Sequence, residues 1–510
     1  MSIRRTAPGW ALVPRAPGTT IVRWLYDALR TQILAGRLSP GSALPATRDL
    51  ARQYGTSRGP VVAAYAQLAA EGYLEATVGS GTFVARTLPE ELLHAAGAAR
   101  VDAPQRTATR RRLARFALGA TVYDTTHPGR LRAFRTNVPA LRLFPTGLWA
   151  QVASRRLRRA TLAMLHGCEP AGYAPLRSAL AGYLARARGV ACDPQRILIV
   201  SGVQEALDLA LRVLVERGER VAVEDPGYPG ARLLLAAAGA RIVRAPVDRD
   251  GVRIEPRHLG GVRLFYVTPA HQFPLGVTLS LERRLTLLEW ARQTGAMVFE
   301  DDYDSEFRYA GRPTPALQGM GGEHHVLLAG SFSKVLFPSL RLGYLVVPPD
   351  LVDRFSAVLS LGHRHAPVLT QAVLADFIDG GHFASHVRRM RGVYAERLEA
   401  LTDAAGRELH GLLEVSPIEA GLQTAGWLAP GFDAGRVCDA AGERDLDLVP
   451  MSRYGPMPGG REGLHLGFAA LEPREIRRGV SSVAALLAAS RGRGRASRGS
   501  RALPGRRDLQ

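Results

Sequence analysis

The stretch GSFSKVLFPSLRLGYLVV, residues 330–347, contains Lys334, the only lysine of the chain. The sequence has 66 lysine and arginine residues in total, so every other residue of these two types is an arginine. Arginine stays protonated at any accessible pH, whereas a desolvated lysine can lose its proton. The neutral amine can then attack a carbonyl carbon and form a Schiff base. We therefore interpret Lys334 as a nucleophile, against the alternative that it is a remainder of compositional drift toward arginine.

Strand-like apolar runs alternate with amphipathic helical stretches on both sides of this lysine, from about residue 135 onward. The runs are ILIVSG, RVAVEDPGYPG, LFYVTPAH, MVFEDDYD, VLLAGSFSK and RLGYLVV. This alternation is typical of an α/β domain with a largely parallel sheet. The polar residues cluster where each strand ends, which is where open α/β sheets bind ligands.

The polar residues of these motifs match the groups of one cofactor. SGVQEAL, residues 201–207, joins a strand end to a helix start whose amides suit a phosphate. Tyr228 of DPGYPG is either a packing aromatic or a flat surface for a planar ring. Strand parity puts Asp301 and Tyr303 on one face, and the GSFSK loop with Arg341 gathers hydroxyl groups and cations. Pyridoxal phosphate needs a lysine for its aldehyde, a carboxylate for its ring nitrogen and a phosphate site.

The order of the motifs resembles that of fold-type I aminotransferases over about residues 135–485. The resemblance implies that Lys334 forms the Schiff base with pyridoxal 5′-phosphate, that Asp301 pairs with the ring nitrogen and that Tyr303 meets the phenolic oxygen. The remaining cofactor contacts that it implies are Tyr228 stacked on the ring, and the amides of Val203 and Gln204 with Ser331, Ser333 and Arg341 around the phosphate.

Three residues near these motifs have open roles. His271, in TPAHQFPLG, lies where the family places a residue near the ring, and a structural role is an equal alternative. Aminotransferases usually place an arginine for the substrate carboxylate where GLHLGFAAL has His465, with Arg461 four residues earlier. A neutral imidazole is a weaker carboxylate anchor than a guanidinium. This departure puts an amino-acid effector in doubt and favours the cofactor itself as a signal.

The first part of the chain predicts a winged helix-turn-helix. Ile21, Leu25, Leu29 and Ile33 form an apolar stripe at four-residue spacing, so a helix is expected over 21–36. A short second helix ends at Gly55 and a third begins after Ser57, which we expect to cap it. The stretch YLEATVGSGTFVA then predicts two strands around a glycine turn.

Residues 20–86 resemble the DNA-binding domain of GntR-type regulators in LRTQILAGRLSPGSALPATRDLA, SRGPVVAAYAQLAAEG and GSGTFV. The resemblance implies that the third helix enters the major groove and that the wing lies beside the minor groove. Arg48, Arg52 and Arg58 are then candidate contacts to phosphates or base edges, with plain surface cations as the alternative. Gly59 and Pro60 offer no side-chain donor, so base readout would depend on Arg58 and the wing.

Positive charge is concentrated at the two ends of the chain, whose formal net charge is +20. Residues 1–86 have ten arginines against four acidic residues, and residues 491–510 have seven against one. This asymmetry indicates a polyanion as the partner of the ends. We predict a DNA-binding domain over 1–86, a basic linker over 87–134, a cofactor-binding domain over 135–490 and a disordered basic tail over 491–510.

A GntR-type domain joined to an aminotransferase-like domain is the arrangement of the MocR family, which this chain resembles. The resemblance implies a transcription regulator that forms a head-to-tail homodimer, binds double-stranded operator DNA and senses pyridoxal phosphate or an amino compound. Two alternatives stay open: an active aminotransferase with an accessory DNA-binding domain, and a DNA-binding protein with an inert large domain.

Other classes of protein are disfavoured by composition. No run of 18 apolar residues predicts a membrane span, and the N-terminus lacks the apolar core of a secretory signal. The cysteines (Cys168, Cys192 and Cys438) are far apart and odd in number, so we expect no metal site and no disulfide framework. The expected location is the cytoplasm, in association with the nucleoid.

Overall fold

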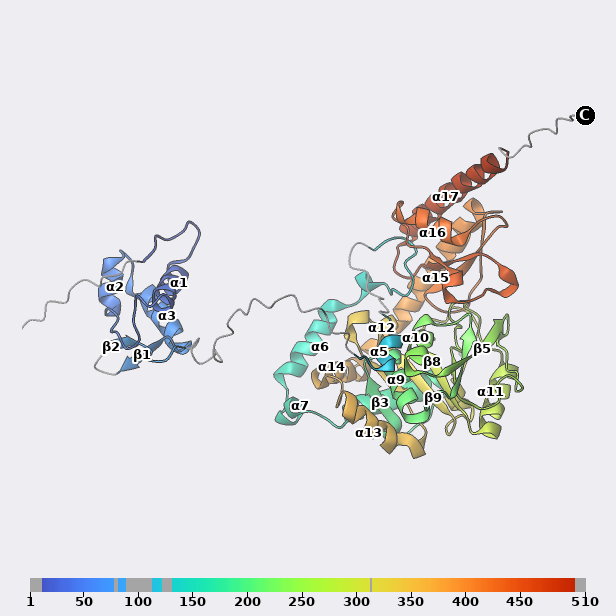
Figure 1. The fold of residues 1–510 in the computed structure, drawn as a ribbon, viewed down its shortest axis with the longest axis horizontal. Coiled ribbons are helices and arrows are strands. Elements are labelled where there is room, and N and C mark those ends of the chain that lie inside the picture. Colours follow the sequence, from blue (N-terminus) through green and yellow to red (C-terminus); the bar gives the residue numbers. More distant parts are fainter. Residues whose placement is uncertain (1–11, 78–80, 89–111, 122–130, 312–313, 500–510) are drawn as a thin grey trace, which may run out of the picture. The chain divides into compact units, whose positions relative to one another are not determined.

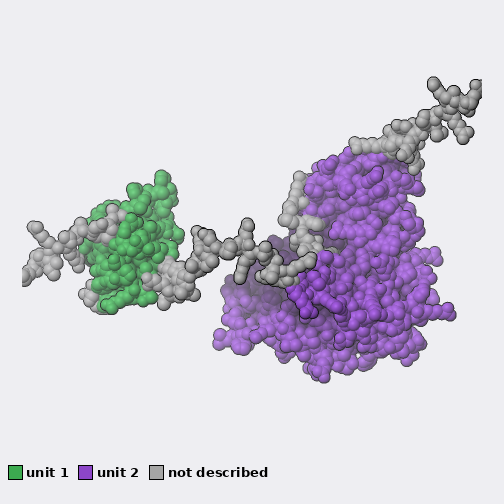
Figure 2. Space-filling view, viewed as in Figure 1, with its two compact units in different colours: residues 1–111 green, residues 112–510 purple. Residues whose placement is uncertain are grey.

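The computed structural model describes residues 12–77, 81–88, 112–121, 131–311 and 314–499. The chain forms two compact units, residues 1–111 and residues 112–510 (Figures 1 and 2). No helix in the described ranges is long and apolar enough to cross a membrane.

The N-terminal unit is a winged helix-turn-helix. Its elements are α1 (Ile21–Leu34), α2 (Thr47–Gln53), α3 (Arg58–Ala70), β1 (Leu74–Thr77) and β2 (Gly81–Val84). The strands are antiparallel, with Leu74 opposite Val84. The predicted stripe of α1 packs on α3 in the core, where Leu25, Leu29 and Leu68 are fully buried.

Ser57 precedes α3 with an extended backbone, as an N-cap residue does, but its side chain makes no capping hydrogen bond. An N-cap oxygen accepts from the amide of the second or third helical residue. The third residue of α3 is Pro60, which has no N–H to donate. The expected position of the N-cap residue is therefore confirmed, whereas the expected capping by the Ser57 side chain is wrong.

The large unit contains an eight-stranded sheet in the order β3-β10-β9-β8-β7-β4-β5-β6. Its strands are β3 (Ile197–Val200), β4 (Arg220–Asp225), β5 (Arg241–Asp248), β6 (Gly251–Val252), β7 (Val262–Val267), β8 (Met297–Asp302), β9 (Val326–Ser331) and β10 (Gly343–Val346). Neighbouring pairs among β5, β4, β7, β8 and β9 are parallel, whereas β10 is antiparallel to both β3 and β9. The α/β domain with a largely parallel sheet that the sequence predicted is thus confirmed.

Helices cover both faces of this sheet, and successive residues of its strands serve opposite faces. Leu198 and Val200 of β3 pack in the core under α9 (Val203–Leu214), α10 (Pro229–Ala238) and α13 (Val352–Gly362). Phe265 of β7 faces the other way, toward Trp290 of α11 (Leu281–Thr294). A strand buried on both faces reads as a continuous apolar run, which is why runs such as ILIV were visible in the sequence.

A second sheet, in the order β11-β12-β14-β13, lies in the C-terminal part of the large unit. Its strands are β11 (Leu413–Val415), β12 (Gln423–Leu428), β13 (Val449–Pro450) and β14 (Gly463–Gly467). The other α-helices among the described residues of the large unit are α5 (Arg115–Gly119), α6 (Thr146–Arg158), α7 (Leu162–His166), α8 (Ala174–Arg188), α12 (Phe332–Val335), α14 (Val368–Asp379), α15 (His382–Glu408), α16 (Ala434–Gly442) and α17 (Pro473–Gly499).

The borders of the large unit differ from the predicted ones. Phe134 belongs to its core at 1% exposure, and the amide of Gly467 donates to the Phe134 carbonyl over 2.9 Å. Within the predicted linker, α5 packs on α10, where Gly119 approaches the backbone of Ala237. At the other end, α17 continues to Gly499, into the stretch predicted to be disordered. Residues 500–510 lie outside the described residues.

Candidate functional site

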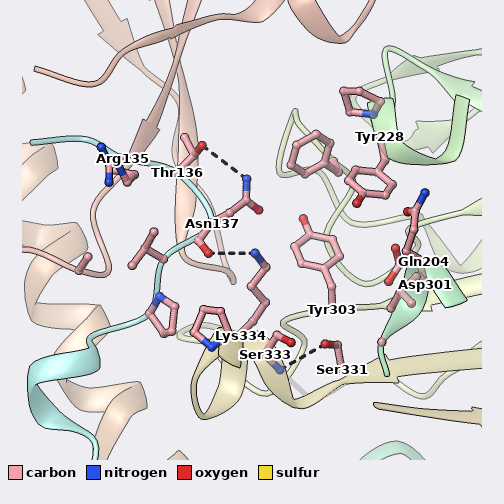
Figure 3. A pocket seen from close by; sticks show the side chains of 18 of the residues that line it. Arg135, Thr136, Asn137, Gln204, Tyr228, Asp301, Tyr303, Ser331, Ser333 and Lys334 are labelled. Atoms are coloured by element: carbon pink, nitrogen blue, oxygen red, sulfur yellow. Dashed lines mark hydrogen bonds between the residues drawn. The ribbon is translucent and has the colours of Figure 1, made fainter. Parts of the chain in front are cut away.

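A cavity of about 650 Å³ opens in the large unit where the carboxyl ends of β7, β8 and β9 meet the start of α9. Figure 3 shows side chains from these elements pointing toward one another around it. All residues that the sequence assigned to the cofactor line this cavity: Val203, Gln204, Tyr228, Asp301, Tyr303, Ser331, Ser333, Lys334 and Arg341.

Lys334 lies in the short helix α12, directly after β9. Its Nζ donates a hydrogen bond to the carbonyl oxygen of Asn137 over 2.9 Å (Figure 3). Burial lowers the pKa of Lys334 to about 8, although the carboxylates of Asp304 and Asp301 oppose this shift. The amine is therefore closer to its neutral, nucleophilic form near neutral pH than a solvated lysine is.

Asp301 presents a buried carboxylate to the cavity from β8. Its Oδ2 accepts a hydrogen bond from the Tyr266 hydroxyl, and its Oδ1 has no hydrogen-bond partner among the described residues. Burial raises the pKa of Asp301 to about 7, against the hydrogen bond from Tyr266, which lowers it. A protonated nitrogen of a ligand would satisfy the free oxygen and stabilise its charge.

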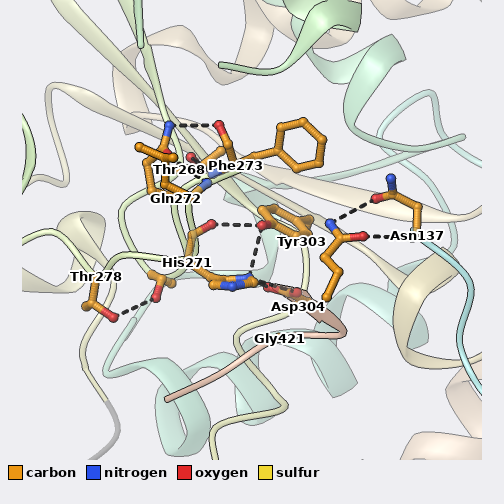
Figure 4. A network of polar contacts seen from close by, with 12 residues as sticks. Asn137, Thr268, His271, Gln272, Phe273, Thr278, Tyr303, Asp304 and Gly421 are labelled. Carbon is orange, nitrogen blue, oxygen red and sulfur yellow. Dashed lines mark hydrogen bonds and ion pairs between the residues drawn. The ribbon is translucent and has the colours of Figure 1, made fainter. Parts of the chain in front are cut away.

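Tyr303 lines the cavity and is held from behind by a polar network (Figure 4). Its hydroxyl donates to the His271 carbonyl over 2.9 Å and lies 3.0 Å from His271 Nδ1. The same nitrogen lies 3.0 Å from Oδ2 of Asp304, and both side chains are almost fully buried. His271 does not line the cavity, so its place in the fold is that of a support for Tyr303.

The start of α9 and the loop after β9 bring groups that can bind an anion to the cavity. Val203 and Gln204 are the first two residues of α9, so their amides have no acceptor within the helix. Gly202 precedes them with φ of 144°, in a region that favours glycine. Across the cavity Arg341 is exposed and has a left-handed backbone with φ of 49°. Helix N-termini and guanidinium groups both favour phosphate.

The aromatic wall contains Tyr228, which precedes α10. Its ring lies 6.4 Å from that of Tyr266 at an angle of 23°, and 5.8 Å from that of Phe273 at 85°. Aromatic neighbours fix the orientation of a ring, so Tyr228 presents a defined surface to the cavity.

His465 and Arg461 both lie outside the lining of the cavity. His465 is fully buried on β14, its Nδ1 lies 3.0 Å from the Tyr454 hydroxyl, and burial lowers its pKa to about 3. The guanidinium of Arg461 lies 4.6 Å from the ring centre of Trp427 and pairs with Glu414 at 3.2 Å. Neither side chain is placed to anchor a carboxylate in the cavity.

Sequence reasoning missed several residues of this site. Asn137 and Arg135 line the cavity from a segment that carried no motif, and Arg135 pairs with Asp447 at 2.6 Å. Gln423 holds Asn137 from β12. Tyr266 could have been predicted from the sequence. The LFYV run predicted a strand whose carboxyl end lies at the same edge of the sheet as the EDDYD motif.

The candidate DNA-contacting arginines lie together in the N-terminal unit. Arg48 and Arg52 are on α2, Arg58 is the first residue of α3, and all are exposed. Arg52 pairs with Asp49 at 2.5 Å, and Nε of Arg58 donates to the Thr47 hydroxyl over 3.2 Å. The second bond ties the start of α3 to the start of α2.

Comparison with known proteins gives the same division of the chain. The family model for bacterial regulatory proteins of the gntR family matches residues 22–84, and the model for aminotransferase class I and II matches residues 149–420. A solved α-aminoadipate aminotransferase of Thermus thermophilus, in complex with N-(5′-phosphopyridoxyl)-L-leucine, is 29% identical with a TM-score of 0.65 over 71% of this chain and 93% of that one. A kynurenine aminotransferase of Pyrococcus horikoshii is 25% identical, with the same TM-score, over 71% and 92%.

The fold and the cavity thus define a winged helix-turn-helix protein with an aminotransferase-like domain, and the cofactor of that domain is pyridoxal 5′-phosphate. The free Oδ1 of Asp301, the amine of Lys334 and the helix start at Val203 fit the ring nitrogen, the aldehyde and the phosphate of this group.

Relatives that match this chain over both of its units identify the family to which it belongs. The "Probable rhizopine catabolism regulatory protein MocR" of Rhizobium meliloti is 39% identical over 90% of this chain and 92% of its own length. The pyridoxine biosynthesis transcriptional regulator PdxR of Corynebacterium glutamicum is 31% identical over 92% and 96%. The chain belongs to the MocR-type subfamily of GntR transcription regulators.

Proposed function

We propose that this regulator binds operator DNA through residues 1–86 and that its affinity for the operator responds to pyridoxal phosphate, or to an amino compound that reacts with it, in the large unit. The observation that carries the proposal is the placement of the chain's only lysine, Lys334, in one cavity with the unpartnered carboxylate oxygen of Asp301. We further propose that the protein acts in the cytoplasm on nucleoid DNA.

The bound cofactor would supply an electrophilic carbon and an electron-withdrawing ring. In this proposal Lys334 provides the amine that bonds to it and Asp301 holds a proton on the ring nitrogen. Tyr303 meets the phenolic oxygen, and its single hydroxyl proton would turn to that oxygen from the His271 carbonyl. Tyr228 stacks on the ring and excludes water from one face. The phosphate is held by the amides of Val203 and Gln204 and by Ser331, Ser333 and Arg341.

We propose that the working form is a homodimer, in the head-to-tail arrangement of the family. Support comes from apolar side chains on the surface of the large unit: Leu162 and Leu165 of α7 are 86% and 64% exposed, and Leu361 of α13 is 87% exposed. Gly167, next to α7, approaches His365, which follows α13, so the segments after these two helices are in contact. Exposed apolar side chains on neighbouring elements favour a protein contact. A Leu165→Glu, Leu361→Glu variant should elute as a monomer in size exclusion with light scattering.

The proposal is tested on the full-length protein with duplexes selected from a randomised pool by binding. Fluorescence anisotropy then measures affinity with and without pyridoxal phosphate, for the wild type and for Lys334→Ala. We expect the cofactor to change the affinity of the wild type and to leave that of Lys334→Ala unchanged. Equal wild-type affinities without pyridoxal phosphate, with it, and with it together with an amino compound would contradict a sensing role.

Amino donors and keto acids supplied to the same protein test the alternative of an active aminotransferase. We expect no steady-state turnover, because His465 and Arg461 are both engaged outside the cavity. Sustained conversion of donor and acceptor would favour the enzyme instead.

A further inference from the structure

Residues 131–139, called here the entry segment, form one wall of the cofactor cavity. The entry segment follows α5, which packs on α10 of the large unit, and residues 122–130 in the sequence. Its start is fixed to the C-terminal sheet region, where Asp447 donates its amide to the Ala133 carbonyl over 2.8 Å. Phe134, in the same segment, is buried in the core of the large unit.

Asn137 is the point at which the entry segment reaches the cofactor lysine. Its backbone carbonyl oxygen accepts the hydrogen bond from Lys334 Nζ, and its backbone amide donates to Gln423 Oε1 over 2.7 Å. Gln423 Nε2 in turn donates to Asn137 Oδ1 over 3.4 Å (Figure 4). Asn137 has φ of 64°, a left-handed conformation in which asparagine is enriched. Gln423 is 3% exposed, and Asn137 is half-buried.

The Lys334 nitrogen has two uses that exclude each other. As an ammonium group it carries three protons and donates one to the Asn137 carbonyl. When it condenses with an aldehyde, the ammonium first loses one proton, a carbon–nitrogen double bond forms, and the carbonyl oxygen leaves as water with the other two. The nitrogen then has at most one proton, and its direction is set by the bonded carbon. No other described group donates a hydrogen bond to the Asn137 carbonyl.

We propose that Asn137 and Gln423 form a latch that holds the entry segment against Lys334, and that bonding of Lys334 to the cofactor aldehyde releases this latch. Gln423 is then a positioning residue that acts on Lys334 through Asn137. Release of the latch frees the entry segment, which lies between the cavity and α5 on the side of the chain that leads to the DNA-binding unit. The inference rests on the proposed function, since it needs Lys334 to be the site of cofactor attachment.

The pH at which the Lys334 amine becomes reactive depends on the groups around it, so this pH reports whether the latch holds. Asp301 and Asp304 face Lys334 from the β8 side, and Arg135 of the entry segment is paired with Asp447. The hydrogen bond to Asn137 adds a neutral acceptor that favours the protonated amine. Loosening Asn137 should therefore lower the pH at which the amine becomes reactive. A defect of folding alone would not move this midpoint.

The test compares the full-length wild type with Gln423→Leu, Gln423→Glu and Gln371→Leu. Gln423→Glu keeps the acceptor for the Asn137 amide, and Gln371 is a buried glutamine of α14 outside the cavity. Stopped-flow absorbance follows the rate of pyridoxal phosphate capture against pH. We expect Gln423→Leu to lower the midpoint by about half a pH unit or more and Gln371→Leu to leave it unchanged. Gln423→Glu should not lower the midpoint, because its carboxylate keeps the acceptor for the Asn137 backbone amide and its charge favours the protonated amine.

Hydrogen exchange of the wild type supplies the second readout. Amides of residues 133–138 should exchange faster after capture of pyridoxal phosphate. They should not do so with 4′-deoxypyridoxine 5′-phosphate, which fills the site without an aldehyde. Unchanged exchange at 133–138 in protein whose Lys334 has bonded to the cofactor overturns the latch and leaves the proposed function standing. A wild type that never bonds the cofactor at Lys334 overturns the proposed function itself.

Discussion

The carboxylate of Asp302 lies 2.7 Å from Nε of Arg188, and the two side chains are 3% and 6% exposed. Each of Asp302 and its neighbour on β8, Asp301, keeps one oxygen without a hydrogen-bond partner among the described residues, but only Asp301 lines the cavity. Successive residues of a strand point to opposite faces. Two adjacent acids of one motif therefore have different surroundings, a buried ion pair and a ligand cavity.

Replacement of these two acids should separate cofactor binding from stability. Asp301→Ala should weaken cofactor retention by about tenfold to a hundredfold, the range expected for a lost charge-assisted hydrogen bond. Asp302→Ala leaves Arg188 buried without its partner and should lower the free energy of unfolding by about 3–5 kcal/mol. Dialysis with absorbance measures retention, and urea unfolding of cofactor-free protein measures stability.

Asp301→Asn is the matched control for this comparison, because it keeps the shape of the side chain and removes its charge. Retention that falls more in Asp302→Ala than in Asp301→Ala, measured on folded protein, would show that the ring-nitrogen partner is assigned to the wrong acid.

The covalent role of Lys334 gives the second prediction. Wild-type protein reduced with borohydride after loading should carry the cofactor on the peptide that contains residue 334, and Lys334→Ala should lose both this adduct and the visible absorbance. Ser333→Ala is the control, since it alters the same loop and keeps the amine. An internal adduct in the Lys334→Ala protein is incompatible with the assignment, because the chain has no other lysine. Peptide mapping distinguishes an internal adduct from an adduct on the α-amino group of the chain.

The pH dependence of capture is the third prediction. Burial lowers the pKa of Lys334 to about 8, and only the neutral amine attacks the aldehyde. The capture rate should rise about tenfold per pH unit below this value and level off above it. Parallel measurements with N-acetyl-lysine correct for titration of the cofactor. A rate that continues to rise toward pH 10 would indicate a solvated lysine.

Much of the site was predictable from the sequence because its residues follow buried parallel strands. An apolar run that ends in polar residues places those residues at one edge of the sheet, and parity then selects Asp301 over Asp302 for the face of Tyr303. The groups that hold these residues were not predictable in this way. Asn137 reaches the cavity through a left-handed turn, and Gln423 belongs to a different sheet. Such contacts depend on how distant segments pack, which periodicity does not report.

The borders of the large unit were also missed for a local reason. The stretch around Phe134 is basic and carries no strand or helix pattern, so the charge suggested a linker. The structure buries Phe134 against Gly479 of α17, a contact between the two ends of the unit. A single buried aromatic between two arginines leaves no periodic signal in the sequence.

The last prediction concerns DNA, where Arg52 and Arg58 should behave differently. Arg52 is exposed on α2 and paired only with Asp49 among the described residues, so we assign it to a phosphate. Arg52→Ala should weaken all duplexes alike and reduce the slope of log affinity against log salt by about one unit per lost contact. Arg58 begins α3, the helix expected in the major groove. If it contacts a guanine, Arg58→Ala should cost about 1–3 kcal/mol on the selected duplex and less on a scrambled one.

Anisotropy titrations over a salt series measure both variants, with Arg249→Ala as the control. Arg249 is 93% exposed in the large unit, so this change removes the same charge away from the helix-turn-helix. It should leave affinity and slope close to those of the wild type, because a single exposed charge outside the contact surface is screened.

Because Nε of Arg58 also donates to the Thr47 hydroxyl, a Thr47→Ala variant is needed as well. It shows how much affinity is lost with this hydrogen bond alone, apart from any contact of Arg58 with a base. Equal losses for Arg58→Ala on the selected and scrambled duplexes would make Arg58 a phosphate contact. Specificity would then have to come from the wing or from the shape of the DNA.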